Sequence, residues 1–398
     1  MPVMPDYAAA RHEAGFHWSV GSSQGTLREL TGTPIRDFNL DPEACIEAYR
    51  RGRPLIRELF GEEMGLPGLA TPAISYGHVN CLGSELLFPE GGEVAHTHPY
   101  GSLEEGLRAL AEPVDFGAAG MAPYFLQFRA GMQQAFPGET VHFGFGPEGP
   151  ITTAYELRGE GFFMDVLDDP PLTQQFLRAA VDSVLAFHRW TCALDGRPAI
   201  SPDGAGLCDD LSSLIPPRLW AEMVLPYWDQ HFLGMTTGAR YAHVENLQAD
   251  HLPHLEAIGL TSYDPSISPK LTPPIIAARC RVPFAWRLES FHCREMSLQD
   301  VADFVFQAAA DGASGVTMTI AEAMCSPEGV AQVHAFIVAA KEAKRLCDEG
   351  TPRPEIAARV SPEGREQLWE GWCGYAGPRS SRGGYRPPGR AQPAREEV

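Results

Sequence analysis

The chain lacks three features that would assign its class at once: a long apolar run, paired cysteines and an N-terminal signal pattern. No stretch of about 18 consecutive apolar residues occurs, so no transmembrane helix is expected. The nine cysteines are scattered without a CxxC pair, so free thiols fit better than a disulfide framework. The start, "MPVMPDYAAARHEAGFHW", has no charged-then-apolar pattern, and we therefore expect a cytoplasmic protein.

Positive charge is also scarce. The chain has 31 Lys and Arg against 51 Asp and Glu, which gives a formal net charge of −20. Nucleic acids and anionic membranes are bound by basic surfaces, so neither is expected as a partner, and a small-molecule substrate fits better. The apolar content of 44% is ordinary for a globular enzyme, and 398 residues can bury a sizeable core.

The two ends of the chain differ from its middle. Residues 1–35 are mixed polar sequence without a clear period, which indicates an N-terminal arm. Residues 349–398 are rich in Pro, Gly, Ser and Arg, and from about residue 374 this tail is too poor in apolar residues to fold. We expect one domain over residues 36–348, with a disordered C-terminal tail.

The middle of the chain alternates short apolar runs with longer helical patterns. "RYAHVEN" leads to "LQADHLPHLEAIGL", and "VPFAWRLES" leads to "SLQDVADFVFQAAADGA", in which Val301, Phe304, Val305 and Ala308 have helical spacing. At least five such units follow one another, and no glycine-rich phosphate turn is present. The pattern predicts an α/β fold, a single-domain (β/α)8 TIM barrel.

A barrel of this kind carries its functional residues at the C-terminal ends of the strands. Six chemically active residues fall at such ends: Asp210, His243, Glu245, Asp264, His292 and Cys325.

Several blocks of the sequence resemble one enzyme family. "HFGFGPEGPITTAYELRG" is similar to a family pattern G-x-x-G-P-x-T-x-A-x-x-L-x-G, and "GLCDDLSSLIPPRLWAEMVLPYWDQHF" resembles its D-D-containing block, the most specific of the matches. Over roughly residues 40–345 the chain resembles the uroporphyrinogen decarboxylase superfamily, which also contains zinc-dependent, corrinoid-linked methyltransferases. The resemblance implies the same (β/α)8 barrel.

The resemblance is closer to the methyltransferases than to the true decarboxylases. The decarboxylases carry an R-Q-A-G-R motif and a late G-H-G, and neither occurs here. Tyr155 falls near the family's active-site tyrosine, and Asp210 matches an aspartate that faces the substrate. Both are therefore expected to be catalytic, together with Asp264, which ends a strand and is placed to position a substrate.

The methyltransferases bind zinc through H-x-C-G and a later cysteine. His243-Val244-Glu245-Asn246 occupies the first position, with Glu in place of Cys, and Cys325 falls where the second cysteine is expected. The resemblance therefore implies a zinc site of His243, Glu245 and Cys325, a ligand set that zinc accepts. No D-x-H-x-x-G module is present, so a corrinoid would be carried by a separate partner protein.

Each of these sites also has a simpler interpretation. His243 and Glu245 can be a hydrogen-bonded pair that orders a loop, and Cys325 can be a buried apolar filler. Cys293, beside His292, competes with Cys325 as the third ligand. Other polar residues are expected to have structural roles: one of Asp209 and Asp210 as a loop or cap residue, His251 and His254 on an outer helix, and His96 and His98 in a surface β-hairpin.

Three functions follow from these expectations. The first is a zinc-assisted methyltransferase that works with a corrinoid protein or a methylated small molecule. The second is a decarboxylase, a carbon–carbon lyase acting on another carboxylated substrate through Asp210 and Tyr155 without metal. The third is a non-catalytic barrel that binds a tetrapyrrole or corrinoid.

Overall fold

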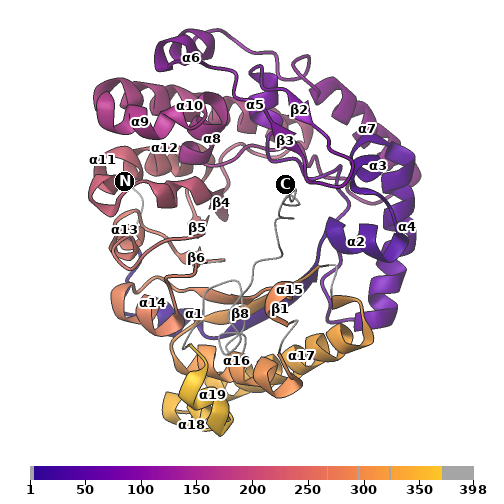
Figure 1. The fold of residues 1–398 in the computed structure, drawn as a ribbon, viewed down its shortest axis with the longest axis vertical. Coiled ribbons are helices and arrows are strands. Elements are labelled where there is room, and N and C mark those ends of the chain that lie inside the picture. Colours follow the sequence, from indigo (N-terminus) through magenta and orange to yellow (C-terminus); the bar gives the residue numbers. More distant parts are fainter. Residues whose placement is uncertain (1–3, 267, 294–295, 322–323, 370–398) are drawn as a thin grey trace, which may run out of the picture.

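The computed structural model describes residues 4–266, 268–293, 296–321 and 324–369. The predicted disorder from about residue 374 lies outside these residues. Figure 1 shows the described chain as a ring of helices with the strands on its inner side. Among the described residues, no helix combines the length and the apolar character needed to cross a membrane.

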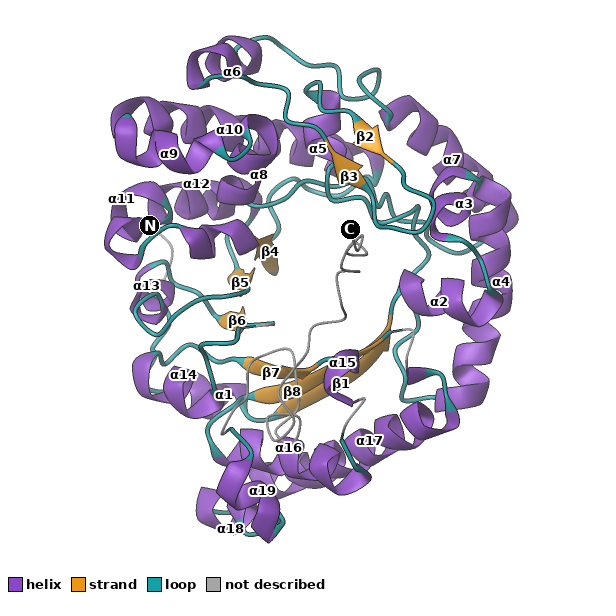
Figure 2. Ribbon diagram, viewed as in Figure 1, coloured by secondary structure: helices purple, strands orange, loops and turns teal. Residues whose placement is uncertain are grey.

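Most strands of the described chain run parallel to their neighbours. The strands are β1 (His17–Ser22), β2 (Leu86–Leu87), β3 (Ala95–His96), β4 (Gly204–Cys208), β5 (Ala239–His243), β6 (Ser262–Asp264), β7 (Ala285–Leu288) and β8 (Gly315–Ile320). Two three-stranded parallel sheets have the orders β4-β5-β6 and β1-β8-β7, and β2 and β3 form the predicted antiparallel hairpin that holds His96. The molecule is thus a mixed α/β protein with parallel sheets, as Figure 2 shows by colour.

Helices occupy most of the rest of the described chain. The α-helices are α1 (Ala10–Ala14), α2 (Gln24–Thr31), α3 (Ile35–Leu40), α4 (Pro42–Phe60), α5 (Gly77–Cys81), α6 (Leu103–Leu110), α7 (Ala122–Ala135), α8 (Pro150–Arg158), α9 (Gly161–Asp168), α10 (Pro170–Leu194), α11 (Trp220–Met223), α12 (Leu225–Met235), α13 (Leu252–Ala257), α14 (Pro273–Arg279), α15 (Ser290–Cys293), α16 (Leu298–Ala310), α17 (Pro327–Asp348), α18 (Arg353–Ala357) and α19 (Pro362–Gln367). Two 3-10 helices, η1 (Asp210–Leu214) and η2 (Pro217–Leu219), follow β4.

Isolated parallel bridges extend the two sheets. Gly21 of β1 bridges to Gly65, Ile74 bridges to Phe145, and Tyr263 of β6 bridges to Phe284 beside β7. The bridge between Tyr263 and Phe284 connects the β4-β5-β6 sheet to the β1-β8-β7 sheet, on the side where β6 lies beside β7. The segments that continue from β1 through residues 65–74 and 141–146 make single bridges rather than ladders.

Helix α16 shows how local sequence produces one of the outer helices. Ser297 caps its first turn by accepting a hydrogen bond from the Asp300 backbone N–H, and Asp300 accepts one in return from the Ser297 backbone N–H. The helically spaced residues Val301, Phe304 and Val305 are all fully buried. The periodicity predicted from the sequence is therefore confirmed, and burial of this apolar stripe holds the helix against the sheet.

The predicted N-terminal arm contributes directly to the sheet. Residues 17–22 form β1, which pairs in parallel with β8 from His17 opposite Gly315 to Ser22 opposite Ile320. Before it, the Tyr7 hydroxyl donates a hydrogen bond to the Leu260 carbonyl at 2.8 Å. The absence of a clear period in residues 1–35 reflects how short each of their elements is. The division of the chain into domains stays a prediction.

Candidate metal and substrate site

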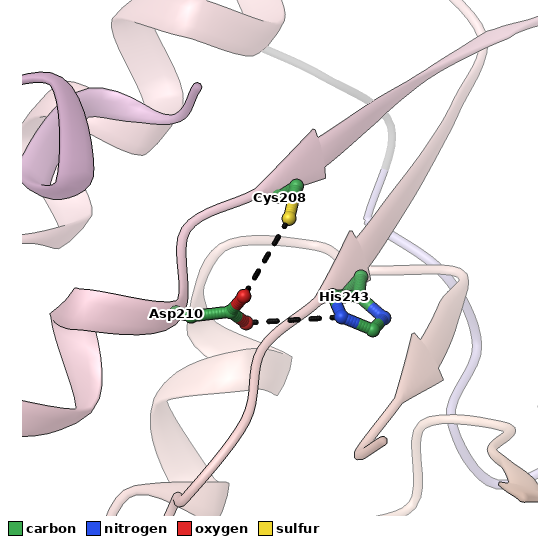
Figure 3. Close-up of side chains that lie close together, drawn as sticks. All are labelled: Cys208, Asp210 and His243. Carbon is green, nitrogen blue, oxygen red and sulfur yellow. Dashed lines mark hydrogen bonds and ion pairs between the residues drawn. The ribbon is translucent and has the colours of Figure 1, made fainter. Parts of the chain in front are cut away.

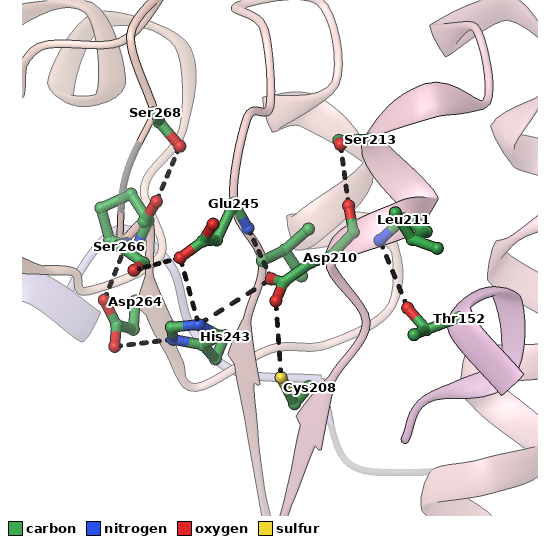
Figure 4. Close-up of polar contacts among 12 residues, drawn as sticks. Thr152, Cys208, Asp210, Leu211, Ser213, His243, Glu245, Asp264, Ser266 and Ser268 are labelled. Atoms are coloured by element: carbon green, nitrogen blue, oxygen red, sulfur yellow. Dashed lines mark hydrogen bonds and ion pairs between the residues drawn. The ribbon is translucent and has the colours of Figure 1, made fainter. Parts of the chain in front are cut away.

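The register of three parallel strands brings the main site residues together. Cys208 at the end of β4 lies opposite His243 of β5, and His243 lies opposite Asp264 of β6. Residues in register on neighbouring parallel strands point to the same face, and so do residues two positions along one strand. Just beyond the strand ends, the Asp210 and Glu245 carboxylates also lie near His243. We call Cys208, Asp210, His243, Glu245 and Asp264 the His243 cluster (Figure 4).

Asp264 holds the His243 ring in one orientation. The distance from His243 Nδ1 to Asp264 Oδ2 is 3.0 Å. A carboxylate oxygen accepts, so Nδ1 donates and Nε2 is left to accept or to bind a metal. Burial by itself would lower the pKa of His243, but the hydrogen bond and charge of Asp264, with the charge of Asp210, raise it above its usual value.

The second ring nitrogen of His243 faces two carboxylates. Nε2 lies 3.8 Å from Asp210 Oδ1 and 3.9 Å from Glu245 Oε1. Both carboxylates are themselves held: the Glu245 backbone N–H donates to Asp210 at 2.9 Å, and the Ser266 hydroxyl donates to Glu245 at 2.7 Å. Hydrogen bonds therefore fix the positions of both carboxylates around His243, so their oxygen atoms are available as metal ligands.

Cys208 joins this set, although sequence reasoning missed it. Donor atoms of Cys208, Asp210 and His243 all lie within 4.8 Å of one another. Figure 3 shows the three side chains together. Desolvation by the neighbouring protein atoms, and then the charges of Glu148 and Asp210, raise the pKa of the Cys208 thiol. The signal available in the sequence was its position in "GLCDD", directly before the two aspartates.

The two aspartates of "GLCDD" have different roles. Asp209 is fully buried and accepts hydrogen bonds from the backbone N–H groups of Ile151 and Thr152 and from the Trp228 indole. It therefore holds the first turn of α8 against the end of β4, a structural role. Asp210 points the other way, toward His243 (Figure 3). The catalytic role of Asp210 stays a prediction.

Arg287 and Glu289, on and just after β7, were also missed from the sequence. The Arg287 guanidinium pairs with Asp264 and lies 3.3 Å from Glu289. Burial would raise the pKa of Asp264, but the hydrogen bond from His243 and the charge of Arg287 lower it below its usual value. The sequence signal was a charged residue inside the apolar strand "VPFAWRLES". Arg287 thus keeps Asp264 ionised and able to hold His243.

Tyr155 and Cys325 have other surroundings. Tyr155 lies on α8, and its ring packs against the rings of His98 and Phe163. The ring centroids of Tyr155 and His98 are 5.1 Å apart. Cys325 lies after β8, partly buried against the apolar core, and burial followed by the charge of Glu29 raises the pKa of its thiol to about 11. Among the described residues, neither side chain forms a hydrogen bond or an ion pair with His243. Their predicted roles stay predictions.

The remaining histidines have structural contacts. His251 is fully buried, its Nε2 donates to the Ile215 carbonyl, and the neighbouring His254 donates to Pro217. Both rings pack on Trp220, so they attach α13 to the segment after β4. His292 accepts a hydrogen bond from the Glu289 backbone N–H.

Cys293, next to His292, is buried, which raises the pKa of its thiol to about 12.

Asn246 follows Glu245 with a φ of 59°, a left-handed conformation that Asn tolerates better than most residues. This turn directs the chain away from the sheet toward α13.

Comparisons with known proteins identify a structural neighbour. A methyltransferase from Methanosarcina mazei superposes with a TM-score of 0.58 and 17% sequence identity, over 84% of this chain and 96% of the other. At that identity the likeness shows the fold alone. No protein-family model matches the chain. No curated protein matches it either.

Proposed function

We propose that this chain is a methyltransferase of the uroporphyrinogen decarboxylase superfamily, built as a closed (β/α)8 barrel, with zinc held by the His243 cluster. The observation that carries the proposal is the orientation of His243, whose Nε2 faces two carboxylates and a thiol. The fold likeness to a methyltransferase supports the same activity.

The donors present fit zinc. Imidazole nitrogen, carboxylate oxygen and thiolate sulfur are its usual ligands, and donor atoms of a tetrahedral zinc lie about 3.4 Å apart. The separations of 3.8 and 3.9 Å from His243 Nε2 need only small side-chain movements to reach that value. Asp264 behind the imidazole supplies the outer hydrogen bond that most metal-bound histidines have.

The ligands we propose are His243 and Glu245 with one thiol. Cys208 is the thiol favoured by the described geometry, and Asp210 is a second carboxylate within reach. Cys325, expected from the family pattern, remains the alternative thiol. When bound, zinc would lower the pKa of a substrate thiol or hydroxyl, or polarise an ether oxygen.

The protein's own groups position the reactants. Asp264 and Arg287 hold His243, and the Glu245 backbone holds Asp210. The Asp210 and Glu245 carboxylates are placed to accept the proton that a nucleophile loses as it takes a methyl group. A corrinoid protein or a methylated small molecule is the proposed methyl donor.

Decarboxylation of a polycarboxylate has less support. Such a substrate needs unpaired cations, and the arginine of the described site, Arg287, is engaged by Asp264 and Glu289. Tyr155, the second group that mechanism needs, packs against His98.

Elemental analysis tests the proposal. We expect about one zinc per chain in the purified protein, and loss of that zinc in His243→Ala. With free methylcobalamin as donor and small thiols as acceptors, we expect zinc-dependent loss of the cobalt–carbon absorption band. A protein that neither contains zinc nor binds it on titration would overturn the proposal.

A further inference from the structure

A cavity of about 610 Å³ lies beside the His243 cluster. One wall is the segment Pro147–Gly149 and the other is β4, and His243 and Cys208 line its inner end. β4 is the edge of its sheet among the described strands, and the Gly149 backbone N–H makes a hydrogen bond to the Cys208 carbonyl across the gap. The cavity therefore opens along the unpaired edge of β4 and reaches the proposed metal site.

Acceptors predominate among the inner polar side chains of this cavity, since the one thiol there, that of Cys208, donates to Asp210. The His231 Nε2 lies 3.4 Å from the Gly206 carbonyl, so Nε2 donates and Nδ1 is left as an acceptor. His231 is 4% exposed, and its Nδ1 has no hydrogen-bond partner among the described residues. Burial lowers the pKa of His231 to about 4, which keeps the ring neutral near pH 7. The Glu148 carboxyl group is an acceptor at the same end.

The cation that lines the cavity lies at its other end. Arg197 is more than half exposed, and its Nε lies 3.2 Å from Asp195. The inner end thus offers no comparable donor among the described lining residues. A ligand that enters fully must supply hydrogen-bond donors or positive charge there, because buried acceptors without donors are costly.

The charge around the inner end has the same sign. Five carboxyl groups, those of Glu148, Asp210, Glu245, Asp264 and Glu289, are accompanied by one guanidinium, that of Arg287. Carboxyl groups therefore outnumber basic groups at this end, although burial raises the pKa of Glu148 to about 7 and also raises that of Glu289. Anionic ligands are repelled by such a site, and cations are attracted.

A buried acid, Glu156, lies behind Glu148. Glu156 is 1% exposed, and both of its carboxyl oxygens lack a hydrogen-bond partner among the described residues. It is close enough to Glu148 and Asp209 for their charges to act on it. Burial raises its pKa well above the usual value, which favours the neutral acid, so Glu156 adds no negative charge to the cavity.

We propose that the cavity binds an organic ammonium ion, with its charged nitrogen at the Glu148 and His243 end. The inference rests on the proposed function in one respect: it identifies the methylated small molecule as a methylated amine. The cavity volume is that of a site for a ligand of metabolite or drug size, so the remainder of the molecule extends along β4.

Three probes of nearly equal shape test this inference by calorimetry at pH 7.5, on both metal-free and zinc-loaded protein. N,N-dimethylethanolamine is a cation with an N–H, choline is a cation without one, and 3,3-dimethylbutan-1-ol is the neutral isostere of choline. We expect both cations to bind at least about tenfold more tightly than the alcohol, since charge-assisted contacts are lost in the neutral molecule. Equal binding of choline and the alcohol, or no binding of either cation, would overturn the inference.

Variants assign the contact to named residues. Glu148→Gln should weaken both cations about tenfold and leave the alcohol unchanged, whereas Glu148→Asp should keep the preference for cations. His231→Phe should weaken the N–H probe more than choline. Glu62→Gln, at an exposed carboxylate, is the matched control. Thermal melting verifies that each variant is folded. If Glu148→Gln does not fold, Glu148→Asp and the three probes still test the inference.

The outcomes separate this inference from the proposed function. Ammonium binding without zinc binding or methyl transfer would support the cation site and overturn the proposed methyltransferase function. Zinc-dependent methyl transfer without ammonium binding would support the proposed function and overturn the cation site.

Discussion

Asp264 and His243 are joined by a hydrogen bond of 3.0 Å between Oδ2 and Nδ1, and this bond determines which nitrogen of the ring faces the neighbouring carboxylates. Arg287 pairs with the same carboxylate from β7. The orientation of the proposed metal ligand is therefore set by residues from three strands, β5, β6 and β7. The predictions below test this arrangement and its surroundings.

Removal of Asp264 should weaken zinc binding without removing a ligand. Asp264→Ala leaves the His243 ring free to turn, and we expect zinc affinity to fall about 10- to 100-fold. Asp264→Asn should have a smaller effect, because its amide oxygen still accepts from Nδ1. Competition with a chromophoric chelator measures the affinity, and wild-type affinity in Asp264→Ala would contradict the proposed role.

The two candidate thiols can be distinguished by single substitutions. The described geometry places Cys208, and not Cys325, within 4.8 Å of donor atoms of both Asp210 and His243. We therefore expect Cys208→Ser to lower the zinc content and Cys325→Ser to leave it unchanged. Elemental analysis after dialysis against a weak chelator gives the result. The opposite pattern would assign the third ligand to the end of β8, as the family pattern predicts.

Gly149 should not tolerate a side chain. A Cβ there would lie 2.5 Å from Asp209 Cβ and 2.6 Å from the Cys208 carbonyl oxygen, so the end of β4 would have to move. We expect Gly149→Ala to cost about 1–3 kcal/mol in the free energy of unfolding, and to lower zinc affinity. Gly146→Ala is the matched control, because a Cβ there meets nothing within 4 Å. Urea denaturation measures both, and equal stabilities would show that β4 adjusts freely.

Glu156 should make stability depend on pH. Burial, and then the charges of Glu148 and Asp209, raise its pKa well above 4.5 in the folded state. Above pH 4.5 the unfolded chain releases this proton while the folded chain retains it, so stability falls as the pH rises toward the folded pKa. Glu156→Gln removes this loss.

The variant should therefore be more stable than the wild type at pH 7.5, with the difference shrinking toward pH 4. Melting temperatures across this range provide the measurement. A difference that does not change with pH would mean that Glu156 is ionised in the folded protein.

Part of the fold follows from local sequence. The stripe of Val301, Phe304 and Val305 predicts α16, because helical periodicity and a capping serine act within a few residues of one another. His243 and Asp264, both expected at the C-terminal ends of strands, lie in register at the ends of β5 and β6. Both inferences need only short-range pattern and the geometry of parallel strands.

Other features depend on contacts between distant segments. The run at residues 141–146 makes single bridges, and a cavity takes the place of a ladder beside β4. Arg287 reads as one charged residue in an apolar strand until Asp264, from a separate unit, pairs with it. The positions of such partners follow from strand register, which one-dimensional spacing does not contain.

By itself, then, the sequence determined the acidic character of the chain, the local helices and the polar residues at the strand ends, including His243, Glu245 and Asp264. Only the tertiary structure decided which of these side chains meet. It brought Cys208 and Asp210 to His243, attached His251 to Ile215, and opened the cavity at Glu148. The physical reason is that register and packing between separate units, and not residue type, set the distances on which charge and hydrogen bonding depend.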